Sequence, residues 1–282
     1  MATPTEQDSP FRLIPATAQD CDGDARRFFQ FSDGVVAASE HETHSKPYES
    51  GAMIPKMPWR PASVLSGFEV ARESNCQSPR VGIFALPPDQ WRAAASSIRD
   101  EIEFSEGTRP VVSNDVAERA LQNCLSHIAE RFDLESEYFH HGAALHNPGH
   151  ETVTINRRTG KYIGLHLDSW DCDTIEGRQH TRTRVCINLG PASRGFLYVP
   201  FQLDEIIAAG SRLVSSSRLN PQTLLDYYFR EFASLPIIRI HIPPGLCCTN
   251  RVRDSSRESS VVAGMHEHTY TPNLQDQELA SL

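Results

Sequence analysis

The chain has 282 residues, with 27 lysines and arginines against 36 aspartates and glutamates, and its formal net charge at pH 7 is −9. This length is enough to bury a large core, and jelly-roll or barrel folds often use it as one domain. The acidic balance gives no electrostatic basis for binding nucleic acid or an anionic membrane, so we expect neither as a partner.

The sequence also argues against membrane insertion, secretion and structural zinc. No apolar run reaches the ~18 residues of a spanning helix. The polar, acidic start Met1–Asp8 does not have the basic and apolar regions of a secretory signal. The seven cysteines are scattered and form no Cys-x-x-Cys pair. We therefore expect a cytoplasmic protein whose thiols are reduced.

The N-terminal part of the chain differs from the rest in its amino-acid composition. Residues 1–62 are rich in proline, serine, aspartate and glutamate and contain few periodic apolar stretches. Proline recurs in Gly51–Pro55 and Met57–Pro61, a pattern typical of extended, irregular backbone. We expect an irregular N-terminal arm over 1–62, followed by a single domain over 63–282.

Two amphipathic helices are predicted next. The first begins around Pro87-Pro88-Asp89 and carries apolar residues at helical spacing as far as Ile102. The second begins at Ser113-Asn114-Asp115, where asparagine or aspartate can cap the helix, and it ends near Phe132. Such helices typically pack their apolar faces against a sheet.

From about Glu151 onward the sequence is typical of short strands. The strand-like runs are 152–155, 161–168, 183–189, 196–199 and 237–242, with a turn at 156–160 between the first two. Two further helices are predicted at about 203–209 and 221–232. We therefore expect an α+β, mainly β fold, in the form of a double-stranded β-helix (jelly roll) with supporting N-terminal helices.

The segment His166-Leu167-Asp168 is the main candidate for chemistry. In a strand, residues i and i+2 point to the same face, so an imidazole and a carboxylate would lie side by side. That pair suits Fe(II), with one more histidine completing a facial triad that leaves positions for substrate and dioxygen. A hydrogen-bonded His–Asp pair on a strand is the alternative interpretation of an isolated His-x-Asp.

Neighbouring segments carry a family resemblance. Tyr162–Asp171 (YIGLHLDSWD), Arg182–Gly190 (RTRVCINLG) and Arg194–Tyr198 (RGFLY) together resemble the iron(II)/2-oxoglutarate-dependent oxygenases. The similarity is to bacterial members that hydroxylate amino acids or natural-product intermediates, and it covers roughly 150–270. It implies Fe(II) as cofactor, 2-oxoglutarate as cosubstrate, and His166 and Asp168 as the first two iron ligands.

The third iron ligand has several candidates: His180, His241, His266 and His268. The resemblance implies an arginine some ten to sixteen residues after this histidine, which grips the 2-oxoglutarate carboxylate. Arg251, Arg253 and Arg257 fit that window after His241, and Arg257-Glu258-Ser259 is similar to the family's Arg-x-Ser pair. Since a guanidinium binds a carboxylate through two hydrogen bonds, we expect His241 as ligand and Arg257 with Ser259 as cosubstrate site.

A second alignment leads to a different set of residues. Family members often carry the distal histidine on the strand that follows a Pro-Gly turn, which here is Pro244-Gly245. On this alignment Arg253 stands at the expected position, so the third ligand is missing. Arg184 or Arg194 would then have to bind the carboxylate.

The resemblance also suggests a substrate site and a reaction. Trp170, Asp171 and Tyr162 are candidate pocket residues because they flank the metal segment. By family analogy, the substrate is a small molecule, an amino acid either free or carrier-bound, and one C–H bond is oxidised by hydroxylation, desaturation or cyclisation. The alternatives are a degenerate jelly-roll binding protein that has lost the third ligand, and a cosubstrate-free metalloenzyme of the cupin type.

Overall fold

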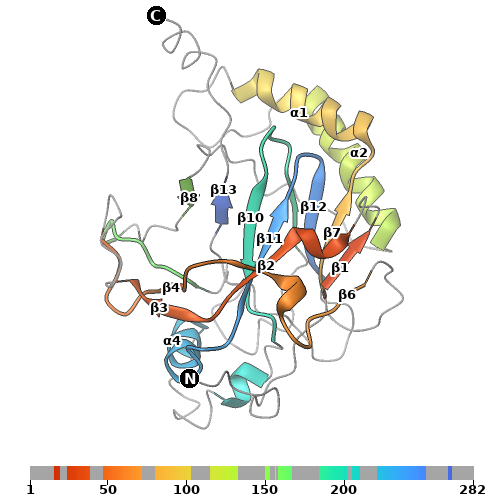
Figure 1. Cartoon of the computed structure of the whole chain (residues 1–282). Coiled ribbons are helices and arrows are strands. Elements are labelled where there is room, and N and C mark those ends of the chain that lie inside the picture. Colours follow the sequence, from red (N-terminus) through yellow and green to blue (C-terminus); the bar gives the residue numbers. More distant parts are fainter. Residues whose placement is uncertain are drawn as a thin grey trace, which may run out of the picture.

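The structure, a computed structural model, has a mixed helix and strand fold that is mainly β (Figure 1). It describes residues 16–19, 24–38, 47–71, 80–102, 115–132, 150–152, 156, 158–166, 184–201, 205–209, 221–251 and 266–268. Within these ranges the strands form a six-stranded, a five-stranded and a two-stranded sheet. None of the helices in the described part of the chain is long and apolar enough to cross a membrane.

The six-stranded sheet is antiparallel throughout. Its order is β5 (Arg60–Pro61), β2 (Phe29–Ser32), β11 (Ile237–Ile242), β10 (Arg194–Tyr198), β13 (His266–His268) and β8 (His150–Thr152). The predicted strand over 237–242 is therefore confirmed with its predicted bounds, and the strand predicted around 196–199 is also present.

The five-stranded sheet combines parallel and antiparallel pairs. Its order is β6 (Val70–Ala71), β1 (Ala16–Gln19), β7 (Arg80–Ala85), β12 (Leu246–Arg251) and β9 (Arg184–Ile187). The short strand β1 is parallel to both of its neighbours, whereas the other pairs are antiparallel. The two-stranded sheet consists of β3 (Val35–Ala37) and β4 (Met53–Pro55).

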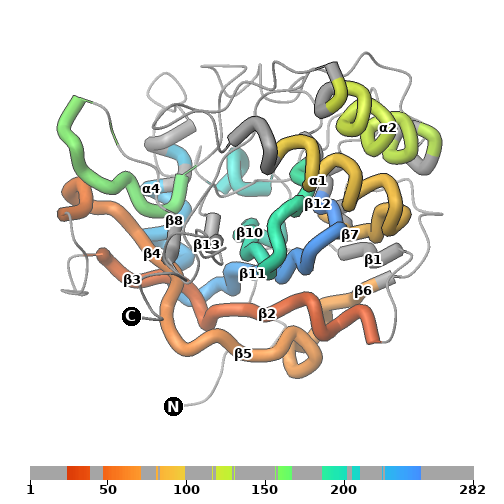
Figure 2. The backbone as a smooth tube through the Cα atoms, turned by 90° about the horizontal axis from the view of Figure 1, so that it is seen from above, coloured from red at the N-terminus to blue at the C-terminus, as the bar shows by residue number. Residues whose placement is uncertain are grey.

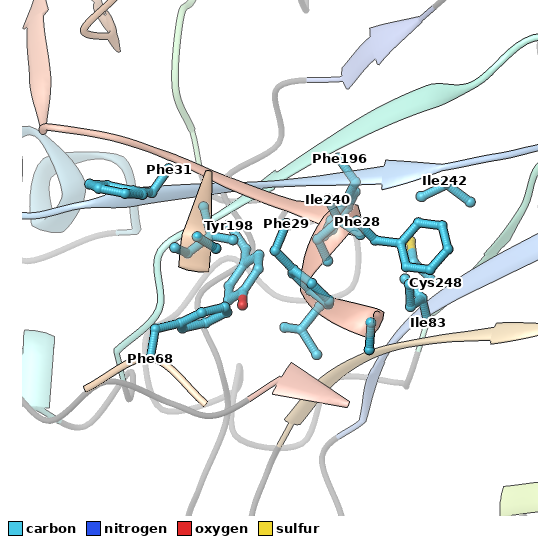
Figure 3. Packing of buried hydrophobic residues seen from close by; sticks show 14 residues of the cluster. Phe28, Phe29, Phe31, Phe68, Ile83, Phe196, Tyr198, Ile240, Ile242 and Cys248 are labelled. Carbon is cyan, nitrogen blue, oxygen red and sulfur yellow. The ribbon is translucent and has the colours of Figure 1, made fainter. Parts of the chain in front are cut away.

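One apolar cluster, which we term the inter-sheet core, joins the two larger sheets (Figure 3). Strand β11 contributes Ile238, Ile240 and Ile242, because alternate residues of a strand share a face. Around them lie aromatic side chains of β2 and β10 and apolar side chains of β7 and β12: Phe29, Phe31, Phe196, Tyr198, Val81, Ile83 and Cys248. The arginine and histidine of β11, at 239 and 241, stand at the alternate positions and are only partly buried.

Helices cover the remaining apolar faces. α1 (Pro88–Ile102) and α2 (Asp115–Phe132) pack on the face of the five-stranded sheet that carries Phe84 and Cys247. Figure 2 shows both helices on one side of β7 and β12, with β2 and β5 on the opposite side. α4 (Pro221–Glu231) packs with Leu197 and Ile237 in a separate cluster of the six-stranded sheet. All four predicted helices are present, the one near 203–209 as a short helix over 205–209.

The N-terminal part differs from the irregular arm predicted for 1–62. Strand β2 lies inside the six-stranded sheet, where it pairs with β11 more than 200 residues further along the chain. The reason is the apolar run Phe28-Phe29-Gln30-Phe31, whose three aromatic rings are all buried. This run is too short to show a clear strand periodicity, and its partner strand is far away in sequence. The prolines and acidic residues around it therefore led to the prediction of an irregular arm.

The segment that leads to His166 is not the continuous strand predicted over 161–168. Tyr162 forms an isolated parallel bridge with Tyr48, and Gly164 has a φ of +69°. A left-handed residue interrupts the regular alternation of side chains along a strand. Gly164 and His166 therefore do not stand at equivalent positions on one face, as they would in a continuous strand. The remaining residues of the run, 167 and 168, lie outside the described part of the chain.

Tyr198 provides a test of the inter-sheet core. Its side chain is 0 % exposed, burial raises the pKa of its hydroxyl, and that hydroxyl has no hydrogen-bond partner within the described ranges. Replacing it by phenylalanine should therefore raise the free energy of unfolding by about 1 kcal/mol, because an unsatisfied buried polar group is removed. Urea denaturation followed by circular dichroism measures this difference.

The matched variant Tyr198→Ala removes the ring as well as the hydroxyl. It should lower the free energy of unfolding by about 3–5 kcal/mol, since a large cavity would remain. A marked loss of stability in Tyr198→Phe would instead show that the hydroxyl contributes a hydrogen bond.

Candidate metal centre

His166 is buried and its ring is held by the backbone. Its side chain is 7 % exposed, and its Nδ1 lies 2.9 Å from the carbonyl oxygen of Gly164. A carbonyl oxygen only accepts, so Nδ1 must carry the hydrogen, and in the neutral ring the lone pair is on Nε2. Histidines that bind metals usually donate their other ring N–H to a carbonyl or carboxylate in this way.

The backbone around His166 is anchored to strand β4. The amide of Leu165 donates to the carbonyl oxygen of Met53 at 2.8 Å, and the side chain of Leu165 is buried in the cluster that also contains Leu197. A Cβ added to Gly164 would lie 2.6 Å from the same Met53 oxygen, so only glycine fits there. The ring of His166 is therefore presented from a fixed piece of backbone.

Many of the predicted site residues lie outside the described part of the chain. They are Asp168, Trp170, Asp171, His180, Arg253, Arg257 and Ser259. His266 and His268 lie on β13, where their backbones pair with Phe196 and Arg194. The backbone of Arg184 on β9 pairs with that of Asn250 on β12.

Tyr162, predicted as a pocket residue, packs against another aromatic side chain. Its ring lies 5.4 Å from that of Tyr48, centroid to centroid, in an edge-to-face arrangement. Its backbone carbonyl accepts from the amide of Glu49, and its amide donates to the carbonyl of Pro47. These contacts join the segment before His166 to the segment that precedes β4.

His241, the predicted third ligand, belongs to a polar cluster on strands β2 and β11. Its Nε2 lies 2.8 Å from Oε1 of Gln30. The same oxygen accepts from Nε of Arg239 at 3.0 Å and also from Nη2 of that arginine. The guanidinium carbon of Arg239 lies 4.4 Å from the ring centroid of Trp59, within range of a cation–π contact.

The two histidines therefore differ in how well they suit a metal ion. His166 has the tautomer that leaves the lone pair on Nε2, so it fits a ligand role. His241 directs Nε2 toward Gln30 and lies beside the positive charge of Arg239, so it does not fit ligation through that nitrogen. Among the described side chains, no group of three or more His, Cys, Asp or Glu residues could hold a metal ion.

Arg194, the alternative partner for the 2-oxoglutarate carboxylate, lies on the face of the six-stranded sheet opposite to that of His241. It shares its strand parity with Phe196 and Tyr198, which point into the inter-sheet core. A hydrogen bond with Cys186 and burial raise the pKa of the Cys248 thiol in that core, and the nearby charge of Arg194 acts in the opposite direction. Arg194 is therefore not on the face of β10 and β11 that carries His241.

The described cysteines offer no activated nucleophile. Cys124, Cys186, Cys247 and Cys248 are not in disulfide bonds. Burial raises the pKa of Cys124 to about 11, and burial also raises the pKa of Cys247 well above its ordinary range. A hydrogen bond with Cys186, together with burial, raises the pKa of Cys248. Because the thiolate is the reactive form, we assign no covalent chemistry to these residues.

Gln30 and Trp59 were not found by sequence reasoning. Both lie in the part of the chain for which an irregular arm was predicted, and neither residue type suggests a metal site. The one available signal is that Gln30 interrupts the aromatic run between Phe29 and Phe31, as expected for a strand with one polar face.

Comparison with protein-family models, with curated proteins and with solved structures found no match to this chain. The function must therefore be inferred from the residues themselves. The strongest observation is the buried imidazole of His166, with its Nδ1 hydrogen bonded to a backbone carbonyl.

Proposed function

We propose that the chain is an Fe(II)/2-oxoglutarate-dependent oxygenase that oxidises a C–H bond of an amino acid or a natural-product intermediate. The observation that carries the proposal is the buried ring of His166, whose Nδ1 donates to the Gly164 carbonyl. That hydrogen bond orients the ring and leaves the lone pair of the neutral imidazole on Nε2, which would bind the metal. Asp168, two residues further on, would supply the carboxylate of a facial triad.

The proposed fold is a jelly roll. Two sheets that share one apolar core, the larger of them antiparallel throughout, support this proposal. In such a fold the helices α1 and α2 form a supporting layer outside the sheets, as they do on the five-stranded sheet here.

The remaining residues of the proposed site follow from the sequence. Arg257 with Ser259 would bind the distal carboxylate of 2-oxoglutarate, with Arg253 and Arg184 as the next candidates. Trp170, Asp171 and Tyr162 would contact the substrate. When bound, the iron would activate dioxygen; the protein would orient the substrate carbon and exclude water.

A second candidate function is supported by the environment of His241. Its Nε2 is directed to Gln30, and Arg239 shares that acceptor, so this histidine does not present the usual ligating nitrogen. A jelly-roll protein that lacks the third ligand would bind a small molecule without oxidising it. Iron affinity should then be weak, because two protein ligands hold the ion less firmly than three.

Anaerobic titration of the metal-free protein tests the proposal. Addition of Fe(II) and 2-oxoglutarate together should produce a weak visible charge-transfer band that saturates near one equivalent, because both bind at one centre. Fe(II) without 2-oxoglutarate is the control. Tight iron binding with no band would favour a cosubstrate-free metalloenzyme, and failure of both to bind would favour the second candidate.

A further inference from the structure

We propose that Gln30 is a positioning residue that fixes the imidazole of His241 as the Nε2–H tautomer, so that the lone pair of the neutral ring is on Nδ1. The tautomer assignment stands on contacts of the described residues alone. Its relevance to a metal centre rests on the proposed function.

The first step is to identify which end of the Gln30 amide faces the cluster. Arg239 donates to it through Nε at 3.0 Å and also through Nη2. A guanidinium has only donors, so the amide atom in contact with it must be the oxygen and not the nitrogen. The arginine thus removes the usual ambiguity between the two ends of a glutamine side chain.

The second step assigns the proton on His241. Its Nε2 lies 2.8 Å from this same oxygen. Since the oxygen can only accept, Nε2 must donate and therefore carries a hydrogen. In the neutral ring the lone pair is then on Nδ1, which is the opposite tautomer from the one at His166.

The third step is that the acceptor is held firmly in place. Gln30 is the direct cross-strand partner of Arg239 in the β2–β11 pair. Its neighbours Phe29 and Phe31 are buried in the inter-sheet core, which fixes the strand. The guanidinium is in turn stacked on Trp59. Because the backbone of Gln30 and the guanidinium of Arg239 are both held in place, the amide oxygen cannot rotate away from His241. It should therefore determine which nitrogen of the His241 ring is protonated.

The assigned tautomer determines through which nitrogen His241 could bind a metal. A metal bound to His241 would have to be bound through Nδ1, whereas His166 would use Nε2. Gln30 would then serve as the hydrogen-bond partner that such histidines require.

The experiment is a long-range proton–nitrogen correlation spectrum of the imidazole rings in the full-length, ¹⁵N-labelled protein. At about pH 8 an ordinary histidine is neutral, so tautomers can be distinguished. His241 is assigned by the signals that disappear in His241→Ala. We expect one protonated resonance at Nε2 and one unprotonated resonance at Nδ1.

Two variants of Gln30 test the causal role. Gln30→Met is close in size but has no acceptor, so the single-tautomer pattern should be lost. Gln30→Glu keeps an oxygen acceptor and should retain the proton on Nε2. Thermal unfolding of both variants checks that the fold is intact. An Nδ1–H tautomer in the wild type, or an unchanged pattern in a folded Gln30→Met, would overturn the proposal.

Adding Zn(II), which is diamagnetic, separates this proposal from the proposed function. A shift at Nδ1 with the Nε2 proton retained supports both. Loss of the Nε2 proton on zinc binding contradicts the role of Gln30. Absence of any zinc effect on His166 and His241, with the expected tautomer still present, counts against the metal centre and leaves the tautomer assignment standing.

Discussion

Replacing His166 with alanine should reduce Fe(II) affinity by more than about 100-fold. Loss of an outer hydrogen-bond partner of a metal-binding histidine alone typically costs 10- to 100-fold, and here the ligand itself is removed. The Gly164 carbonyl keeps the hydrogen on Nδ1, so Nε2 carries the lone pair that would bind the metal, and alanine offers no atom to replace it. Anaerobic competition with a chromophoric chelator measures the affinity.

Two further variants make this result interpretable. His127, a partly buried histidine on α2, is the matched control, and His127→Ala should leave iron binding unchanged. His166→Gln keeps a polar side chain that can still donate to the Gly164 carbonyl, so it guards against loss of the local fold. Wild-type affinity in a folded His166→Ala protein would rule out His166 as a ligand.

The elements with strong local patterns could be predicted from the sequence. Helices α1, α2 and α4 have apolar residues at helical spacing, and β11 is an apolar run ended by Pro243-Pro244. Their packing partners are set by amphipathic faces, which the sequence shows directly. This is why these elements were placed within a few residues of their observed bounds.

The elements that depend on distant contacts could not be predicted in this way. Strand β2 has only four residues and becomes ordered through pairing with β11 and burial of its phenylalanines. The prediction of a continuous strand over 161–168 was wrong because the pattern of apolar residues does not reveal that Gly164 adopts a left-handed conformation. The Gln30–Arg239–His241 network was missed for the same reason as β2, since it exists only once the two strands pair.

Gly34→Ala should be among the most destabilising single substitutions in the described part of the chain, with a loss of more than about 4 kcal/mol. Gly34 has a φ of +111°, and a Cβ there would lie 1.9 Å from the carbonyl oxygen of Ala233. That oxygen accepts the amide hydrogen of Val35 at 2.8 Å. Relief of the overlap would therefore separate the start of β3 from the segment between α4 and β11.

Gly160→Ala is the control that isolates the steric contribution. Gly160 also has a positive φ, +71°, but nothing lies within 4 Å of an added Cβ. Its substitution should cost only the about 1–2 kcal/mol of a left-handed conformation. Urea unfolding midpoints and slopes give both values. The difference between the two variants then measures how tightly β3 is held against the α4–β11 segment, and equal losses would mean that this contact can relax at little cost.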